Sequence, residues 1–405
     1  MNTLPDELLL EIIDCATDVA GELDSNLDDR FRVPSLVDME EMLKATMPTR
    51  RALVQVSRRL WNLATPVLYR SIIITHPHKI NLLFKSIMEY GERSLLFQRV
   101  VRRFHLSICG VRRHHWRKAV AGTEELMKHL PNLKISCARG YRHPTNPLLF
   151  TALDPATSFP HLEAIQHLSS TSVLTTMESI SHLMRSSPNL RVCLVLPYED
   201  DFEPKPNLYT FKYLKACYAD ALINFIPNLE DTNKPPLSSQ TPFPPLRSLY
   251  CTSKILQNIN HNLSRHITLL DIAYYDWRKK GNVLDLSEFP QLRSMIISLS
   301  PDLWYFKVSD KNDKLREVGV RSYVLPPGET LVRNYQALVE LVLGFPVRIQ
   351  RTRVLYFSMC RHIVRLGLHQ STDLLTCWKK LEERGISLEG PDGLPLVEFI
   401  ASLSR

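Results

Sequence analysis

The feature that most constrains the fold of this chain is a six-residue pattern, hydrophobic-x-x-hydrophobic-x-hydrophobic, which recurs through most of its 405 residues. In the second half the pattern begins at Leu246, Ile267, Leu292, Leu315, Leu338 and Ile363. These first members are 21, 25, 23, 23 and 25 residues apart. Earlier copies begin at Leu133, Leu162 and Leu190, and a shorter copy lies at Phe104 and Leu106. A unit of this length cannot bury its own apolar face, so neighbouring units must stack.

Each unit predicts a short strand, a turn and a helix, with the strand burying alternate residues and the helix covering the other side. Stacked units would form a curved array with a roughly parallel sheet. Spacings of 20–29 residues with this pattern are typical of leucine-rich repeats. We therefore expect residues 76–405 to form an irregular leucine-rich-repeat-like solenoid. Residues 229–246, which include five prolines, predict an exposed loop, and the chain from about Leu374 predicts a C-terminal helical cap.

The first residues, MNTLPDELLLEIIDCAT, predict an amphipathic helix with an unusually wide apolar arc. Pro5 suits the start of a helix, and acidic residues in the first turn favour the helix dipole. Two neighbouring apolar stripes follow at helical spacing, one with Leu8, Ile12 and Cys15 and the other with Leu9, Ile13 and Ala16. One stripe is sufficient for packing within the chain, so the second is available to a partner.

A second helix is predicted to start near Pro48 and to present Leu53, Val56, Leu60 and Leu63 on one stripe. We expect this stripe to pack on the first helix through Leu53, Val56 and Leu60. The helix should break at Thr65-Pro66, because proline removes a backbone donor. Residues 69–75 are rich in β-branched side chains and predict a strand.

Residues 1–75 resemble an F-box, of the type expanded in mushroom-forming fungi. The first half of the family pattern is matched by Leu4, Pro5, Glu7, Leu8 and Ile12. The second half is matched by Leu53, Val56, Ser57, Arg58, Arg59, Leu63, Ala64, Pro66, Leu68, Tyr69, Arg70 and Ser71. Two departures stand out: Leu60 occupies the family's tryptophan position, with Trp61 beside it, and residues 17–47 form an insertion where the family has a short loop.

The resemblance implies binding to Skp1, the adaptor of a cullin–RING ubiquitin ligase. The residues expected at that interface are Leu4, Pro5, Leu8, Ile12, Leu53, Val56, Leu60 and Trp61. The insertion at 17–47 carries eight acidic and three basic residues. We expect a solvated surface loop that ends in a short helix around residues 38–45, with a regulatory acidic loop as the alternative.

The chain shows no catalytic motif. We find no G-x-S-x-G, Walker A or H-E-x-x-H sequence, and 13 glycines leave little material for phosphate-binding loops. The eight widely spaced cysteines predict reduced thiols in a cytoplasmic or nuclear protein. No run approaches the roughly 20 apolar residues of a membrane span. We therefore expect no enzyme activity, no cofactor, no bound metal and no membrane partner.

Two clusters outside the first module are candidate partner-binding residues. The segment 98–118 contains seven basic residues and no acid, and its candidates are Arg112, Arg113, Trp116 and Arg117. Because charge runs are more often solvated surface, a strand flanked by solvated loops is the alternative. Tyr275 and Trp277 follow a predicted strand, where exposed aromatic side chains can anchor an interface; ordinary packing within a degenerate repeat is the alternative.

These observations predict an α/β protein with a short helical F-box-like module, followed by an irregular leucine-rich-repeat solenoid. The expected function is the substrate-recognition subunit of a Skp1-cullin-F-box ubiquitin ligase, with a protein substrate held by the repeats. The alternative is a non-catalytic scaffold whose first helices cap the solenoid. That scaffold would bind an acidic partner or nucleic acid, consistent with the net charge of +8, although we do not expect nucleic acid. The exposure of Leu8 and Ile12 distinguishes the two hypotheses.

Overall fold

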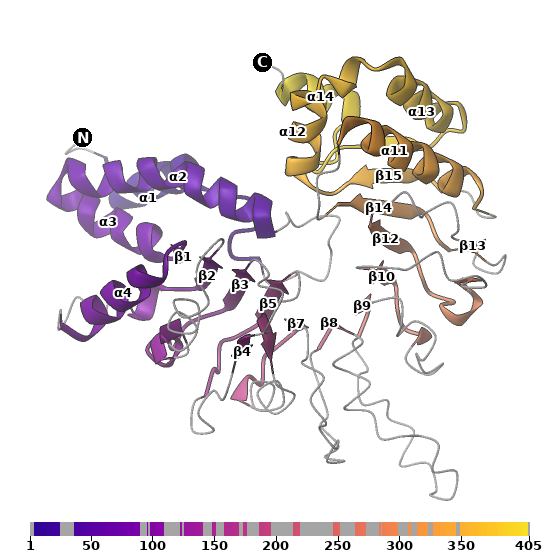
Figure 1. Ribbon diagram of the computed structural model, residues 1–405. Helices are drawn as coiled ribbons and strands as arrows, with labels where there is room; N and C mark the ends of the chain where they lie inside the picture. The colour runs from indigo at the N-terminus through magenta and orange to yellow at the C-terminus, as the bar shows by residue number, and fades with distance from the viewer. Residues whose placement is uncertain are drawn as a thin grey trace, which may run out of the picture. The chain divides into compact units, whose positions relative to one another are not determined.

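The computed structural model (Figure 1) divides the chain into two compact units. One unit comprises Met1–Leu27 and Met39–Lys205, and the other comprises Asp28–Asp38 and Pro206–Arg405. The structure describes residues 4–24, 36–89, 95, 98–108, 122–123, 125–140, 148–150, 158–169, 173–175, 186–195, 214–218, 246–251, 264–272, 283–284, 286–298, 307–308, 314–322, 327–345 and 349–403.

Three helices open the chain: α1 (Asp6–Thr17), α2 (Leu36–Val56) and α3 (Arg58–Tyr69). Pro5 precedes α1, and its carbonyl oxygen accepts the first helical hydrogen bond from the Leu9 N–H at 3.1 Å. Strand β1 (Ser71–Ile74) follows α3 as predicted, and α4 (Pro77–Glu89) comes next.

The helix boundaries differ from the predicted ones at two prolines. Helix α2 already begins at Leu36 and runs through Pro48, so Pro48 does not start it. The break falls at Ser57, whose hydroxyl caps α3 by accepting a hydrogen bond from the Leu60 N–H at 3.1 Å. Helix α3 then runs through Pro66, because the packing of its buried face outweighs the loss of one backbone donor.

Twelve described strands form the main series in chain order, and the described strand pairs within each unit are parallel. The first unit holds β1, β2 (Arg103–Ile108), β3 (Ile135–Gly140), β5 (Ala164–Ser169) and β7 (Val192–Val195). The second unit holds β8 (Ala216–Tyr218), β9 (Ser248–Cys251), β10 (Leu269–Ile272), β12 (Ser294–Ser298), β14 (Glu317–Arg321), β15 (Arg351–Val354) and β16 (Ser387–Glu389). The α/β, leucine-rich-repeat-like architecture is therefore confirmed. The structure also has two short parallel strand pairs outside this series. One joins β4 (Leu148–Phe150) to β6 (Val173–Thr175), and the other joins β11 (Val283–Leu284) to β13 (Lys307–Val308). A 3-10 turn lies at Leu286–Glu288.

The repeat pattern locates most of these strands. Strands β2, β3, β5, β7, β9, β10, β12 and β14 all lie where the pattern predicts them. The register aligns equivalent positions of neighbouring units, so that Leu270 of β10 pairs with Met295 of β12, and Met295 with Val318 of β14. All three of these side chains are buried.

Two predicted strands are wrong. The copy at Leu338 lies within helix α11 (Gly328–Leu343), and the copy at Ile363 lies in α12 (Phe357–Arg365). The first and fourth positions of the pattern are three residues apart, which is also the spacing of one helix face, so the two structures share the signal. The strands of these last units are instead β15 and β16. The sequence pattern also did not predict β8.

The prediction that only alternate strand residues are buried is also wrong for β9 and β10. All four residues of each strand are buried, as is usual for parallel sheets covered on both faces. Asp271 of β10 is among them, and its Oδ2 accepts a hydrogen bond from the Arg321 Nη1 of β14 at 2.6 Å. This buried ion pair crosses β12, which lies between the two strands.

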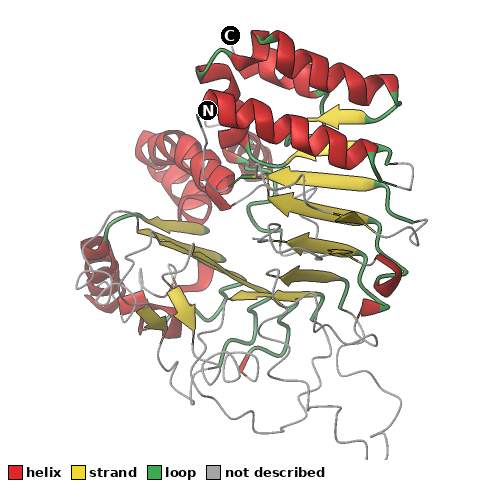
Figure 2. Ribbon diagram, turned by 45° about the vertical axis from the view of Figure 1, so that its right-hand side comes forward, coloured by secondary structure: helices red, strands yellow, loops and turns green. Residues whose placement is uncertain are grey.

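Helices gather at the C-terminal end of the second unit (Figure 2). Helix α11 packs against α13 (Thr372–Glu383), and α12 packs against α14 (Leu396–Leu403). Helix α13 also contacts β16, so a strand lies within the region where we predicted only helices. Among the described helices, none combines the length and hydrophobicity of a transmembrane span.

Candidate partner-binding site

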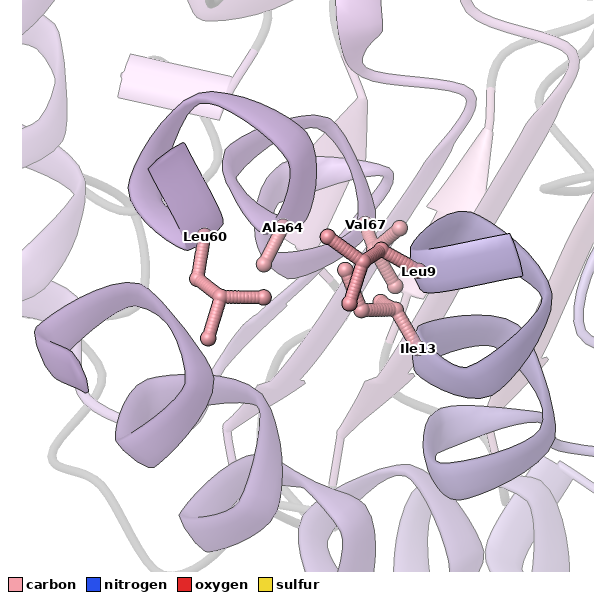
Figure 3. Close-up of a cluster of buried hydrophobic side chains, with 5 residues drawn as sticks. All are labelled: Leu9, Ile13, Leu60, Ala64 and Val67. Atoms are coloured by element: carbon pink, nitrogen blue, oxygen red, sulfur yellow. The ribbon is translucent and has the colours of Figure 1, made fainter. Parts of the chain in front are cut away.

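Helix α1 has one apolar stripe in the core and another in solvent. Leu9 and Ile13 are 6% and 1% exposed and join a cluster with Leu60, Ala64 and Val67 of α3. Figure 3 shows Leu9 and Ile13 pointing from α1 toward these α3 side chains. Ala16, predicted on the same stripe, is exposed, and the buried face continues at Thr17 instead. The two stripes therefore differ in role, the inner one packing in the core at Leu9 and Ile13 and the outer one facing solvent.

The outer stripe remains exposed. Leu8 is 45% exposed and Ile12 is 53% exposed, and Cys15 continues the same stripe. Leu4, just before the helix, is also exposed, whereas Leu10 is exposed on another side of α1. A large apolar side chain in water is common by itself, but several on one helix face are typical of an interaction surface.

The second half of the module adds to this surface unevenly. Trp61 is exposed, Leu53 is half-buried against the core cluster, and Leu60 is buried within it; in the first half, Pro5 is exposed as well. Val56 was predicted to face α1, but it is 59% exposed. It is the last residue of α2, and the break at Ser57 takes it off the stripe that continues in α3.

Arginine side chains hold both ends of α1. At the N-terminal end, Arg59 of α3 donates a hydrogen bond from Nε to Asp6 at 2.7 Å and another from Nη2 to the Leu4 carbonyl oxygen at 2.5 Å. The groups of this ion pair are substantially exposed, and exposed pairs contribute only about 0–1 kcal/mol to stability.

The C-terminal end of α1 is held by a buried ionic cluster, which we call the Glu22 cluster and define as Glu22, Arg50 and Arg70. Arg50 of α2 donates to both oxygens of the Glu22 carboxylate, at 2.8 and 2.7 Å. Arg70, which caps α3, donates to the same carboxylate from Nε at 2.8 Å. Both arginines also point Nη2 at the carbonyl oxygen of Thr17, at 2.9 and 3.5 Å.

The cluster also extends to the sheet. Arg103 of β2 donates from Nη1 to the carbonyl oxygen of Glu22 at 3.0 Å. The carbonyl oxygen of Arg70 accepts from the N–H groups of Arg102 and Arg103, each at 2.9 Å. The Glu22 cluster therefore ties the end of α1 to α2, α3 and the first strand pair.

Electrostatics favour the charged form of Glu22. Burial alone would raise the pKa of its carboxyl, but the hydrogen bonds and positive charges of Arg50 and Arg70 outweigh that effect and lower the pKa below its ordinary value. Removing one partner of such a buried pair typically costs about 3–5 kcal/mol, because the remaining charge stays buried.

We predicted a solvated loop for the acidic insertion, but some of its described residues are buried. Glu22 is buried, and so is Glu40, which accepts a hydrogen bond from the Ser107 hydroxyl of β2 at 2.6 Å. Sequence reasoning missed both acids because a charge count does not indicate which carboxylate meets an arginine or a hydroxyl group in the fold. One signal was present: Arg50 lies three and four residues before Leu53 and Val54, on the helix face that turns inward.

The other candidate residues fall on parts of the chain that are not described. Arg112, Arg113, Trp116 and Arg117 lie outside the described residues, as do Tyr275 and Trp277 and nearly all of the proline-rich segment 229–246.

The seven described cysteines are free thiols, and only Cys15 among them is exposed. Burial raises the pKa of the Cys193 thiol to about 12, which keeps it protonated and unreactive near neutral pH. Cys15 is therefore the accessible thiol of this set, and it lies on the outer stripe of α1.

Neither the scan against protein-family models nor the search of curated proteins gives a match.

Proposed function

We propose that this protein is the substrate-recognition subunit of a Skp1-cullin-F-box ubiquitin ligase. Helices α1 and α3 would bind the Skp1 adaptor, and the repeat-like body would bind a protein substrate. The observation that carries this proposal is the division of α1 into a packed stripe at Leu9 and Ile13 and an exposed stripe at Leu8 and Ile12. The exposed stripe coincides with positions that match the first half of the F-box pattern.

The mechanism would be proximity rather than chemistry. Holding a substrate close to a ubiquitin-conjugating enzyme that carries ubiquitin raises the effective concentration of the substrate's lysine side chains. Such a subunit needs a rigid connection between its two binding surfaces. The pairing of β1 with β2 and the bond from Arg103 to Glu22 provide a connection between the helices and the first strands.

The test is direct binding of the full chain to purified Skp1, with the double variant Leu8→Asp/Ile12→Asp as the comparison. We expect the unmodified chain to form a stable complex and the variant to lose it while remaining folded. Failure of the unmodified chain to bind Skp1 would reject the proposal. Deletion of residues 1–75 is a poorer test, because it removes β1 and uncovers the edge of β2.

A second function, a cap on the repeat array, draws on the same connection between the helices and the first strands. The N-terminal helices are joined to the sheet by β1 and by Arg103, as expected of a cap on a repeat array. In that case the chain would be a scaffold without an adaptor. Leu8→Asp/Ile12→Asp would then leave every binding activity of the chain unchanged, whereas disruption of β1 would destabilise the strands that follow.

A further inference from the structure

We propose that the Glu22 cluster is a positioning device, which fixes helix α1 so that Leu8 and Ile12 are presented to the partner. This inference rests on the proposed function, because it assigns a role in adaptor binding to residues that do not contact the adaptor. It also gives the insertion 17–47 a purpose, since Glu22 belongs to it.

Helix α1 needs external support. It is only twelve residues long, and isolated helices of this length are marginal in water. Its packing against α3 rests on two buried side chains, Leu9 and Ile13, near its middle. Packing along one stripe leaves tilting and rotation of the helix weakly opposed, whereas binding surfaces require orientation within about 10–20°.

The Glu22 cluster opposes tilting and rotation of α1 at its C-terminal end. The last carbonyl groups of a helix lack intrahelical donors and carry partial negative charge. In α1, the Thr17 carbonyl oxygen receives two guanidinium groups, from Arg50 and Arg70. Because Arg50 belongs to α2 and Arg70 to the end of α3, the direction of α1 is fixed relative to both helices.

The strength of the two end contacts is unequal. The Arg59 contact at the start of α1 is exposed, and solvent screens it. The Arg50 and Glu22 side chains are buried, and Arg70 is largely buried, so their interactions are screened much less. We therefore assign the control of helix orientation to the Glu22 cluster and only a minor share to Arg59.

The principal variant is Glu22→Gln, which keeps the shape of the side chain and removes its charge. We expect about tenfold weaker binding of the full chain to purified Skp1. We also expect faster hydrogen exchange of the α1 amides and unchanged exchange in β2 and β3. Glu22→Asp, which restores the carboxylate, should recover part of the affinity. Asp18→Asn is the matched control: it removes an exposed acid from the same insertion, at the C-cap of α1 where a negative charge does not favour the helix, so it should neither weaken binding nor speed exchange.

A positioning role also predicts coupling between distant residues. Ile12→Ala should weaken Skp1 binding less in the Glu22→Gln background than in the unmodified chain, because α1 is already misplaced there. A purely structural role for Glu22 predicts independent effects, since Ile12 lies on the exposed stripe of α1 and is not part of the Glu22 cluster. Independent effects of the two substitutions would overturn the inference.

If Glu22→Gln unfolds the module, Arg70→Met provides a milder test, because it removes one of the two arginines from the carboxylate. We expect a three- to tenfold loss of affinity with the strands intact, whereas Arg51→Met, an exposed neighbour of Arg50, should have no effect. Skp1 affinity equal to that of the unmodified chain, in a folded Glu22→Gln or Arg70→Met variant, would overturn the inference alone. Failure of the unmodified chain to bind Skp1 would instead reject the proposed function.

Discussion

Replacing Leu8 and Ile12 together by aspartate is the perturbation that most sharply separates an adaptor-binding surface from an ordinary solvated helix. Full burial of a leucine or isoleucine side chain contributes about 1.5–3 kcal/mol. Leu8 is 45% and Ile12 is 53% exposed, so a partner has about half of each side chain left to cover. Covering both therefore contributes about 1.5–3 kcal/mol in total, which is roughly ten- to a hundredfold in affinity.

Aspartate adds a second penalty, because a partner would have to bury its charge. We therefore expect Leu8→Asp/Ile12→Asp to weaken Skp1 binding by about a hundredfold or more. The thermal melting temperature should change little, because both side chains already face solvent in the free chain. The assay is calorimetric titration of purified Skp1 into each full-length chain, together with a thermal melt.

The matched control lies on the same helix, one residue away. Leu9→Ala and Ile13→Ala remove side chains from the core cluster, and each should destabilise the module by about 2–5 kcal/mol. This pair should lower the melting temperature, whereas the aspartate pair should lower only the affinity. If the aspartate pair binds Skp1 as tightly as the unmodified chain, the assignment of the outer stripe to the adaptor is refuted.

Three further predictions test the ionic and thiol groups. Because the pKa of Glu22 is lowered in the folded state, its carboxylate stabilises the fold at pH values above the ordinary value of 4.5, and this contribution is lost as the pH falls toward the lowered pKa. In thermal melts from pH 6 to 3, the difference in melting temperature between the unmodified chain and Glu22→Gln should shrink below about pH 4.5. A constant difference would contradict this. Iodoacetamide should modify Cys15 first among the described cysteines, and bound Skp1 should slow that reaction. Peptide mass mapping measures the rate, and equal rates with and without Skp1 would place the partner elsewhere. In the second unit, Asp271→Asn alone should lower the urea midpoint more than the double variant Asp271→Leu/Arg321→Met, because the single change takes the carboxylate away from a charge that stays buried. The opposite order would contradict the role of the buried pair.

The repeat pattern predicts the fold well because it reports a physical requirement. Leu270, Met295 and Val318 are buried side by side on neighbouring strands and must be apolar, so their spacing identifies the units. The same pattern fails at Leu338, where Tyr335 and Val342 complete a helical face that buries equally well. Periodicity alone therefore does not separate a strand from a helix in the last two units.

The candidate site is predictable in its apolar part and not in its ionic part. The outer and inner stripes of α1 follow from helical spacing, and the exposure of Leu8 and Ile12 agrees with the division expected. The exposure of Val56 could not be predicted from helical spacing, because it depends on the helix break at Ser57, where the Ser57 hydroxyl caps α3. The pairing of Glu22 with Arg50 joins residues 28 positions apart, and such contacts are set by the tertiary fold rather than by local sequence.

The central claim is that α1 and α3 form a surface for Skp1, and hydrogen exchange of the full chain with and without purified Skp1 tests it most directly. We predict that Skp1 slows exchange over residues 6–17 and 58–69, while the amides of β9, β10, β12 and β14 exchange at unchanged rates. Unchanged exchange over residues 6–17 at saturating Skp1 would contradict the claim. Slowed exchange confined to the strands would contradict it equally, because the adaptor would then occupy the surface assigned to the substrate.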